Sequence, residues 1–290
     1  MLSELNENKL IKTKLHFKII LENGFNIIKE NSSEIDVYHS LFKRFINCID
    51  SINLLIVGFD NQTKHRNQSI AIILRASLLD YLTTLYLRTF QAEKKAGIKS
   101  QKTTYDTEVD KLLSEQIRRV LSISEKDKKT SAYNHERFCK SVDNFHHNFK
   151  PLFDNSKPID YNKPANSLKF KQKDDISSWI IRERLDSFSN NLKGIDYLHV
   201  FNLYNTYSKF DHFGLASILF EHMDINEICD NMFWSIFHIT DGISFCVDLL
   251  KDETGCQSNF DRMLKEIDYL RGTIYTKHLI LSKEFKEKNK

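Results

Sequence analysis

Apolar residues recur at intervals of three and four along almost the whole chain, which is the spacing of one face of an α-helix. No strand-like alternation competes with this period, and no segment repeats at a fixed interval. The chain is therefore expected to be all-α, a multi-helix bundle of about seven to eight helices in a single domain over residues 1–290. The predicted helices lie at about 4–29, 37–56, 67–87, 133–149, 174–190, 196–223, 224–250 and 260–286.

Two stretches depart from the helical pattern. Residues 91–130 are rich in charge and poor in apolar side chains, so we expect a charged peripheral insertion, helical in part around 109–123. Residues 150–173 contain all three prolines and are expected to form a basic loop.

The stretch from Arg137 to Lys173 has an excess of positive charge, because eight lysines and arginines face three acidic residues. Aromatic residues are interspersed among these charges. Such a stretch could hold single-stranded nucleic acid by charge and stacking. The favoured alternative is a solvated loop whose aromatic rings pin it to the bundle.

Composition agrees with a helical protein and excludes several function classes. The 290 residues are 41% hydrophobic, and 8 Gly and 3 Pro are too few turn residues for a β-sandwich, a barrel or a doubly wound sheet. The 42 basic and 39 acidic side chains leave a net charge of +3, which does not by itself call for a polyanionic partner. The chain has no GxGxxG, GxxxxGK[ST], GxSxG or HExxH motif, and we expect no cofactor.

The five cysteines are odd in number and form no CxxC pair, which favours reduced thiols in a cytoplasmic protein. The first residues include no continuous apolar run, so no secretory signal is expected. The most apolar predicted helix, 67–87, contains Arg75 and Asp80, each of which would cost roughly 3 kcal/mol at the middle of a bilayer. We therefore expect a buried helix and no membrane partner.

Polar residues interrupt the apolar stripes of two predicted helices. In the helix at 196–223, Ser208 and His212 stand four residues apart on one face, and Tyr204 precedes them by one turn. A buried hydroxyl or imidazole needs a hydrogen-bond partner. Arg75 lies in the most apolar predicted helix, and its permanent charge needs a partner there for the same reason.

These interruptions could converge on one polar pocket. Arg75 would bind or stabilise a phosphate there, and His212 would act as an acid or base near neutral pH. The alternative is a structural network, in which Arg75 pairs with a carboxylate and His212 with a backbone carbonyl. The candidate catalytic residues are Arg75, His212 and Ser208, and the candidate binding residues are Tyr204, Asp80 and Asp211.

The two motifs resemble known proteins. The run YNTYSKFDH from Tyr204 to His212 stands downstream of an apolar helix with the run RASLLD from Arg75 to Asp80. This order is similar to a group of uncharacterised bacterial all-helical proteins, in which an Arg-x(3-4)-acid helix precedes a Tyr-x-x-x-Ser-x-x-x-His helix. The chain also resembles, distantly, the HEPN superfamily of helical bundles. Many HEPN proteins are metal-independent ribonucleases of toxin and phage-defence systems.

The resemblance implies a bacterial protein that binds or cleaves RNA or a nucleotide, in a defence or toxin system, and that forms a homodimer. The chain departs from the HEPN nuclease signature, Arg-polar-x(3-5)-His. Arg66-Asn67 has the right opening, but no histidine follows at the required spacing. Arg271 and His278 have the spacing, but Gly272 replaces the polar residue. The chain could therefore be a HEPN-related protein without nuclease activity. The alternative function is a non-catalytic helical protein-interaction or oligomerisation module.

Potential metal ligands also gather between His135 and His147. His135 and His146 are eleven residues apart, or about 16 Å along an unbroken helix, and one ion with bonds of about 2 Å cannot join them. His135 and Cys139 could supply half a site. We expect no metal.

Overall fold

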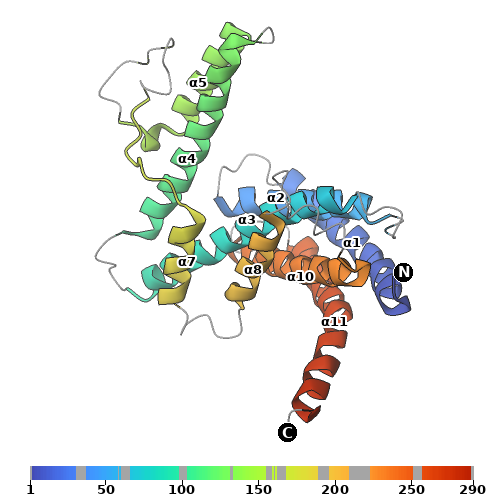
Figure 1. Cartoon of the computed structure of the whole chain (residues 1–290). Coiled ribbons are helices and arrows are strands. Elements are labelled where there is room, and N and C mark those ends of the chain that lie inside the picture. The colour runs from blue at the N-terminus through green and yellow to red at the C-terminus, as the bar shows by residue number, and fades with distance from the viewer. Residues whose placement is uncertain are drawn as a thin grey trace. The chain divides into compact units, whose positions relative to one another are not determined.

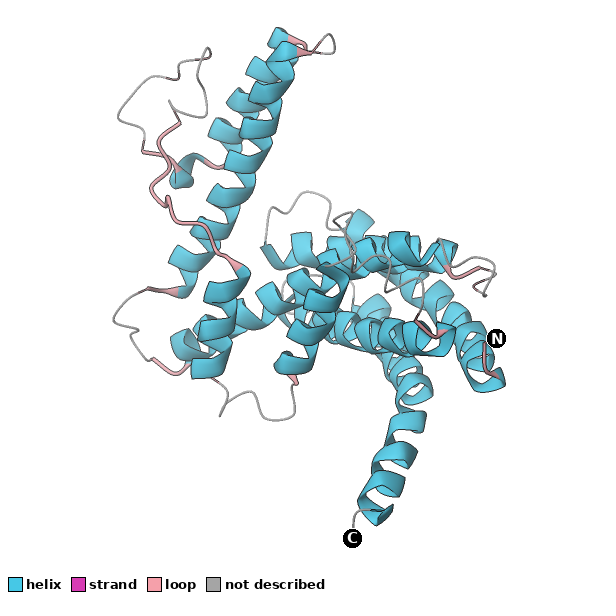
Figure 2. Cartoon of the chain, viewed as in Figure 1, coloured by secondary structure: helices cyan, strands magenta, loops and turns pink. Residues whose placement is uncertain are grey.

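The computed structural model describes most of the chain, and the described part is largely helical (Figures 1 and 2). The described residues are 2–30, 37–57, 59, 66–97, 103–130, 133–154, 159, 161, 168–188, 196–208, 223–250 and 257–288, with the backbone alone at 66, 67, 127 and 275–288. The helices are α1 (Glu4–Glu30), α2 (Val37–Leu55), α3 (Arg66–Lys95), α4 (Tyr105–Lys126), α5 (His135–Asn148), α7 (Ser178–Ser187), α8 (Tyr197–Ser208), α10 (Ile225–Leu250) and α11 (Gln257–Lys288), with short 3₁₀ turns η2 (Asp127–Lys129) and η3 (Lys150–Leu152). Within those ranges there is no strand, so the all-α prediction is confirmed there. The nine α-helices found there are close to the seven to eight expected.

Predicted and observed bounds agree to within one residue for α1 and α10. The helix predicted at 67–87 continues as α3 to Lys95, and α4 fills much of the stretch 91–130. That stretch is therefore more helical than its composition indicated, and its peripheral position stays a prediction.

The chain forms two compact units, and a single domain over residues 1–290 stays a prediction. The first unit consists of residues 1–85 and 190–290, and the second of residues 86–189. The chain passes from the first unit to the second within α3.

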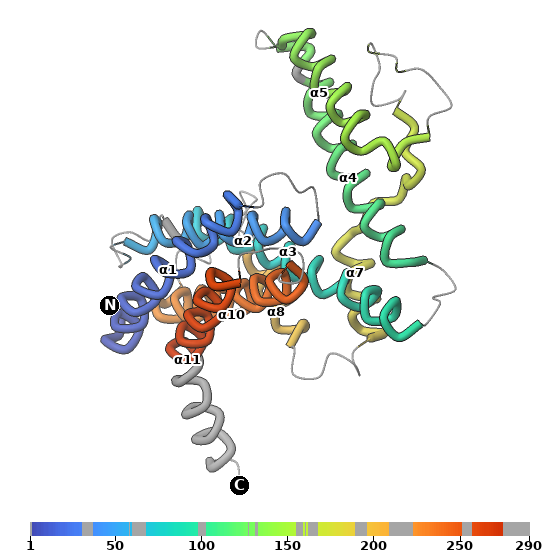
Figure 3. The backbone as a smooth tube through the Cα atoms, turned by 180° about the vertical axis from the view of Figure 1, so that it is seen from behind, coloured from blue at the N-terminus to red at the C-terminus, as the bar shows by residue number. Residues whose placement is uncertain are grey.

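The core of the first unit lies among α1, α2, α10 and α11. α1 packs along α11 and against α2, and α2 packs along α10 (Figures 1 and 3). Phe45 of α2 is fully buried, and the backbone of α10 approaches its ring closely at Gly242. Cys48 and Cys246 are buried too, and burial raises the pKa of Cys48 to about 12, which is typical of an inert core thiol.

Two helical segments, Gln68–Lys95 and Ile225–Leu250, are long and apolar enough to cross a membrane by length and composition. In each, 61% of the most apolar window is buried inside the structure, and a buried core helix passes the same test. The pattern is weak evidence for a span, and the expected absence of a membrane partner stays a prediction.

The second unit has a separate apolar cluster, which α4 and α5 share with the segments around residues 152 and 169. Phe153 and Phe170 are 2% and 5% exposed, and their ring centroids lie 4.8 Å apart. The buried members of the cluster are Ile117, Leu121, Phe138, Val142, Leu152, Phe153, Leu168 and Phe170. These two rings therefore pin the basic loop to its unit, as the second of the two sequence interpretations supposed.

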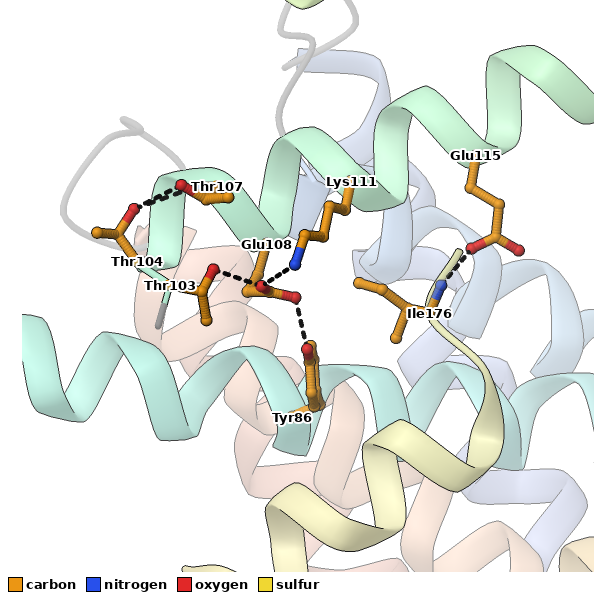
Figure 4. A network of polar contacts seen from close by, with 8 residues as sticks. All are labelled: Tyr86, Thr103, Thr104, Thr107, Glu108, Lys111, Glu115 and Ile176. Atoms are coloured by element: carbon orange, nitrogen blue, oxygen red, sulfur yellow. Dashed lines mark hydrogen bonds and ion pairs between the residues drawn. The ribbon is translucent and has the colours of Figure 1, made fainter. Parts of the chain in front are cut away.

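A carboxylate of α4 is the centre of a polar network in the same unit (Figure 4). The side chain of Glu108 is 2% exposed, and it accepts hydrogen bonds from Tyr86 Oη at 2.5 Å, Thr103 Oγ1 at 2.5 Å and Lys111 Nζ at 2.8 Å. Burial alone would raise the pKa of Glu108, but these donors outweigh it and lower the pKa below the usual value. The ionised form of Glu108 thus ties α3 to the start of α4.

Candidate functional site

The two motifs of the sequence analysis meet where α3 contacts α8 in the first unit. Arg75 Nε donates a hydrogen bond to Ser208 Oγ at 3.1 Å, although 133 positions separate the two residues. The guanidinium carbon of Arg75 lies 5.8 Å from the centroid of the Tyr204 ring. Three candidate residues from the two motifs therefore form one cluster, which we call the Arg75 cluster (Arg75, Tyr204 and Ser208).

Ser208 positions the guanidinium through two hydrogen bonds. Its hydroxyl donates to the Tyr204 carbonyl at 2.8 Å, a bond to the preceding turn of α8, and its oxygen accepts from Arg75. The hydroxyl proton is committed to the backbone, so in this arrangement Ser208 is an orienting group. A catalytic part for Ser208 stays a prediction.

The cluster lies at the margin of the core. Arg75, Tyr204 and Ser208 are each half-buried, whereas Val200 and Tyr207 of α8 are buried. A guanidinium in this position is always charged, is partly desolvated and has a fixed orientation over an aromatic face. That combination suits a phosphate or another oxyanion.

Asp80, predicted as an orienting carboxylate, lies in an ion pair with a residue that the sequence analysis did not single out. Arg44 Nε of α2 is 2.8 Å from Asp80 Oδ2. Burial raises the pKa of Asp80, and the bond to Arg44 opposes that rise. The available signal for Arg44 was a charge among the apolar positions Phe42 and Phe45 of its helix.

His212 and Asp211 lie outside the described residues, so their place in the predicted pocket stays a prediction. The side chains of Arg66 and His278 are outside them as well. Arg271 forms a close ion pair with Asp241 of α10 and lies over the ring of Phe237.

The potential metal ligands of α5 form a pair. Cys139 Sγ lies 3.6 Å from His135 Nε2 at the surface of the second unit. Within the described ranges, no group of three or more His, Cys, Asp or Glu side chains could hold a metal ion.

Comparison with known proteins gives no relative for this chain. No family model matches it, and neither a curated protein nor a solved structure matches it.

Proposed function

We propose that this chain is a HEPN-like bacterial helical protein that binds RNA or a nucleotide at the Arg75 cluster, within a defence or toxin system. The observation that carries the proposal is the hydrogen bond between Arg75 and Ser208, because it joins the two motifs on which the resemblance rests. A phosphate would bind to the guanidinium, and Tyr204 would support the charge from its ring face.

Metal-independent cleavage of RNA would require one more side chain at this binding site, an acid or base. His212 follows Ser208 by four residues, and an imidazole there could remove or supply a proton beside a phosphate that Arg75 holds. General acid–base catalysis of this kind contributes roughly 10²–10⁴-fold to a rate.

Binding is tested with a fluorescein-labelled single-stranded RNA oligonucleotide, by anisotropy over a range of salt concentrations. We expect Arg75→Gln to weaken binding about tenfold or more, since a charge-assisted hydrogen bond is lost. It should also reduce the slope of log affinity against log salt by about 0.7, the value for one phosphate contact on a single strand. Arg262→Gln removes the same charge from an exposed site on α11 and is the matched control. Equal affinity for both variants would refute the proposed binding site.

Cleavage is tested with the same RNA in EDTA. Wild-type protein is compared with His212→Ala, and the fold of each is checked by circular dichroism. Cleavage by the wild type alone would support His212 as the acid or base. Cleavage by both proteins would exclude His212. If neither cleaves the RNA while Arg75-dependent binding persists, the chain is a binding protein and not a nuclease.

An exposed apolar ridge on α1 favours a second candidate function, self-association. Ile11, Leu15 and Ile19 are 56%, 63% and 39% exposed, and their spacing of four residues forms one ridge of the helix. Two such ridges interdigitate when helices cross at about −50°, so a second copy could cover the ridge. We expect Leu15→Glu to convert a dimer into a monomer in light scattering. Leu54→Glu, at another exposed apolar position in the same unit, is the control. A monomeric wild type would refute this candidate.

A further inference from the structure

A thiol and an imidazole meet on α5 in the second unit. Cys139 Sγ lies 3.6 Å from His135 Nε2, and the spacing of four residues places the two side chains on one face of the helix. The side chain of Asn134 accepts a hydrogen bond from the backbone N–H of Arg137 and so begins the helix directly before His135. The start of α5 therefore fixes where the imidazole lies relative to the thiol.

Tyr133 orients the imidazole from its other nitrogen. Tyr133 Oη lies 2.9 Å from His135 Nδ1, and the tyrosine ring packs against the buried ring of Phe138 with the centroids 6.0 Å apart. In the tautomer that donates from Nδ1 to Tyr133 Oη, Nε2 keeps its lone pair and faces the thiol. Cys139, His135 and Tyr133 thus have the arrangement of nucleophile, base and orienting group that activated cysteines share.

Access to solvent distinguishes Cys139 from the other cysteines that the structure describes. Those other thiols are buried, at Cys48, Cys229 and Cys246. Cys139 is half-buried, and His135 beside it is exposed. Structural thiols in a core are inert, whereas a partly exposed thiol next to a basic group is reactive. Within the described part of the chain, Cys139 is therefore the cysteine that a small molecule in water can reach.

The carboxylates near the thiol have partners of their own. One turn further along α5, Asp143 Oδ1 accepts a hydrogen bond from Tyr161 Oη at 2.6 Å, and this bond raises the pKa of Tyr161. A negative charge on Cys139 adds to that rise, so the thiol lies within electrostatic reach of the tyrosine. Glu136 forms an ion pair with Lys140 at 3.2 Å. The imidazole of the pair is thus the group placed to accept the thiol proton.

We propose that Cys139 is a nucleophilic thiol that forms mixed disulfides with small disulfides, and that His135 is its base. The imidazole takes the thiol proton, and the Cys139 sulfur attacks one sulfur of the small disulfide. A new S–S bond forms as the old one breaks, and the departing thiolate takes the proton back from His135. The exchange consumes one disulfide and releases one thiol, so it needs no other oxidant. This inference does not rest on the proposed function, because the Arg75 cluster belongs to the first unit.

The test is the rate at which the full-length protein reacts with glutathione disulfide, followed by mass spectrometry, with peptide mapping to locate the modified cysteine. We expect modification at Cys139 that dithiothreitol reverses. Unassisted thiols are only a few per cent ionised at pH 7, and the gain from a base is partly offset because a more acidic thiol gives a weaker nucleophile. His135→Gln should therefore slow the reaction about threefold at pH 7. At about pH 10 the thiol ionises without a base, so the variant and the wild type should react at equal rates.

Two further variants separate the base from its surroundings. His147→Gln removes an exposed imidazole from the same helix and should leave the rate unchanged. Tyr133→Phe keeps the ring that packs against Phe138 but removes its oxygen, and it should slow the reaction at pH 7 by less than His135→Gln does. Modification chiefly at a cysteine other than Cys139, or equal rates for the wild type and His135→Gln at pH 7, would overturn the proposal.

Discussion

A methyl group at Gly242 should destabilise the first unit, because the backbone of α10 lies close against a ring of α2 there. A Cβ atom at this position would lie 2.6 Å from Phe45 Cζ, 2.9 Å from Cε2 and 3.2 Å from Cε1. The Phe45 ring is fully buried, so it has no open space into which it can move. Gly242→Ala therefore forces either the ring or the helix backbone to shift.

Two opposing effects decide the magnitude. Alanine is better than glycine in a helix interior by about 1 kcal/mol. Overpacking a well-packed core typically costs 1–3 kcal/mol, and three contacts with a rigid ring place this site at about 3. The expected net loss is about 2 kcal/mol of unfolding free energy. For a chain of this size, that loss lowers Tm by roughly 4–8 °C.

The assay is urea unfolding followed by far-UV circular dichroism, with calorimetry for Tm. Gly272→Ala in α11 is the matched control, because its Cβ would meet no atom within 4 Å. That control keeps the helix-propensity gain without the clash, so it should be more stable than the wild type by about 1 kcal/mol. If Gly242→Ala is stabilised as much as Gly272→Ala, the close packing of α2 on α10 is wrong.

Three further predictions concern charged groups. The pKa of Glu108 is lower in the folded than in the unfolded protein, where it is about 4.5. Its ionised form therefore stabilises the fold above about pH 4.5, and this stabilisation is lost as pH falls through the lower folded pKa. Glu108→Gln should make the free energy of unfolding depend less on pH in this acidic range. Arg44→Met removes the ion-pair partner of the buried Asp80 carboxylate. Because the Arg44 side chain is 56% exposed, solvent screens the pair, and calorimetry should show a loss of about 1 kcal/mol that Asp80→Asn largely restores in the double variant. If the Arg75 cluster is the binding site, replacing Lys169 and Lys171 by Gln should leave the RNA affinity, measured by anisotropy at constant salt, within about twofold of the wild type. A larger loss of affinity would place RNA binding on the second unit.

The helices were predictable because their apolar period is local, but their ends depend on distant partners. The apolar pattern predicts that the third helix ends near residue 87, where polar residues become frequent. The structure continues α3 because Arg184 of α7 holds its last turns. Arg184 Nε donates to Thr89 Oγ1 at 2.8 Å, its guanidinium lies 4.0 Å from the Phe90 ring centroid, and Glu93 forms an ion pair with it at 2.8 Å. A partner about 90 positions away leaves no signal in the local pattern.

The candidate site shows the same division between local and distant information. The helical period placed Tyr204 and Ser208 on one face, and the structure brings Arg75 to that face. The pairing of Asp80 with Arg44 depends on how α2 and α3 dock, which no spacing within either helix specifies. The sequence therefore predicts that each buried charge needs a partner, but it does not predict which carboxylate pairs with which cation.

The structure also changes the weight of the two possible nucleic-acid surfaces. The basic stretch 137–173 was a candidate because it combined charge with aromatic rings. Phe153 and Phe170 are buried in the apolar cluster. Exposing a buried aromatic side chain costs about 3 kcal/mol of hydrophobic free energy, which is as much as its stacking on one base would contribute to binding. What remains there for RNA is surface charge without those two rings. The Arg75 cluster keeps a charge and an aromatic face together at a half-buried position, so it is the stronger candidate for holding a nucleotide.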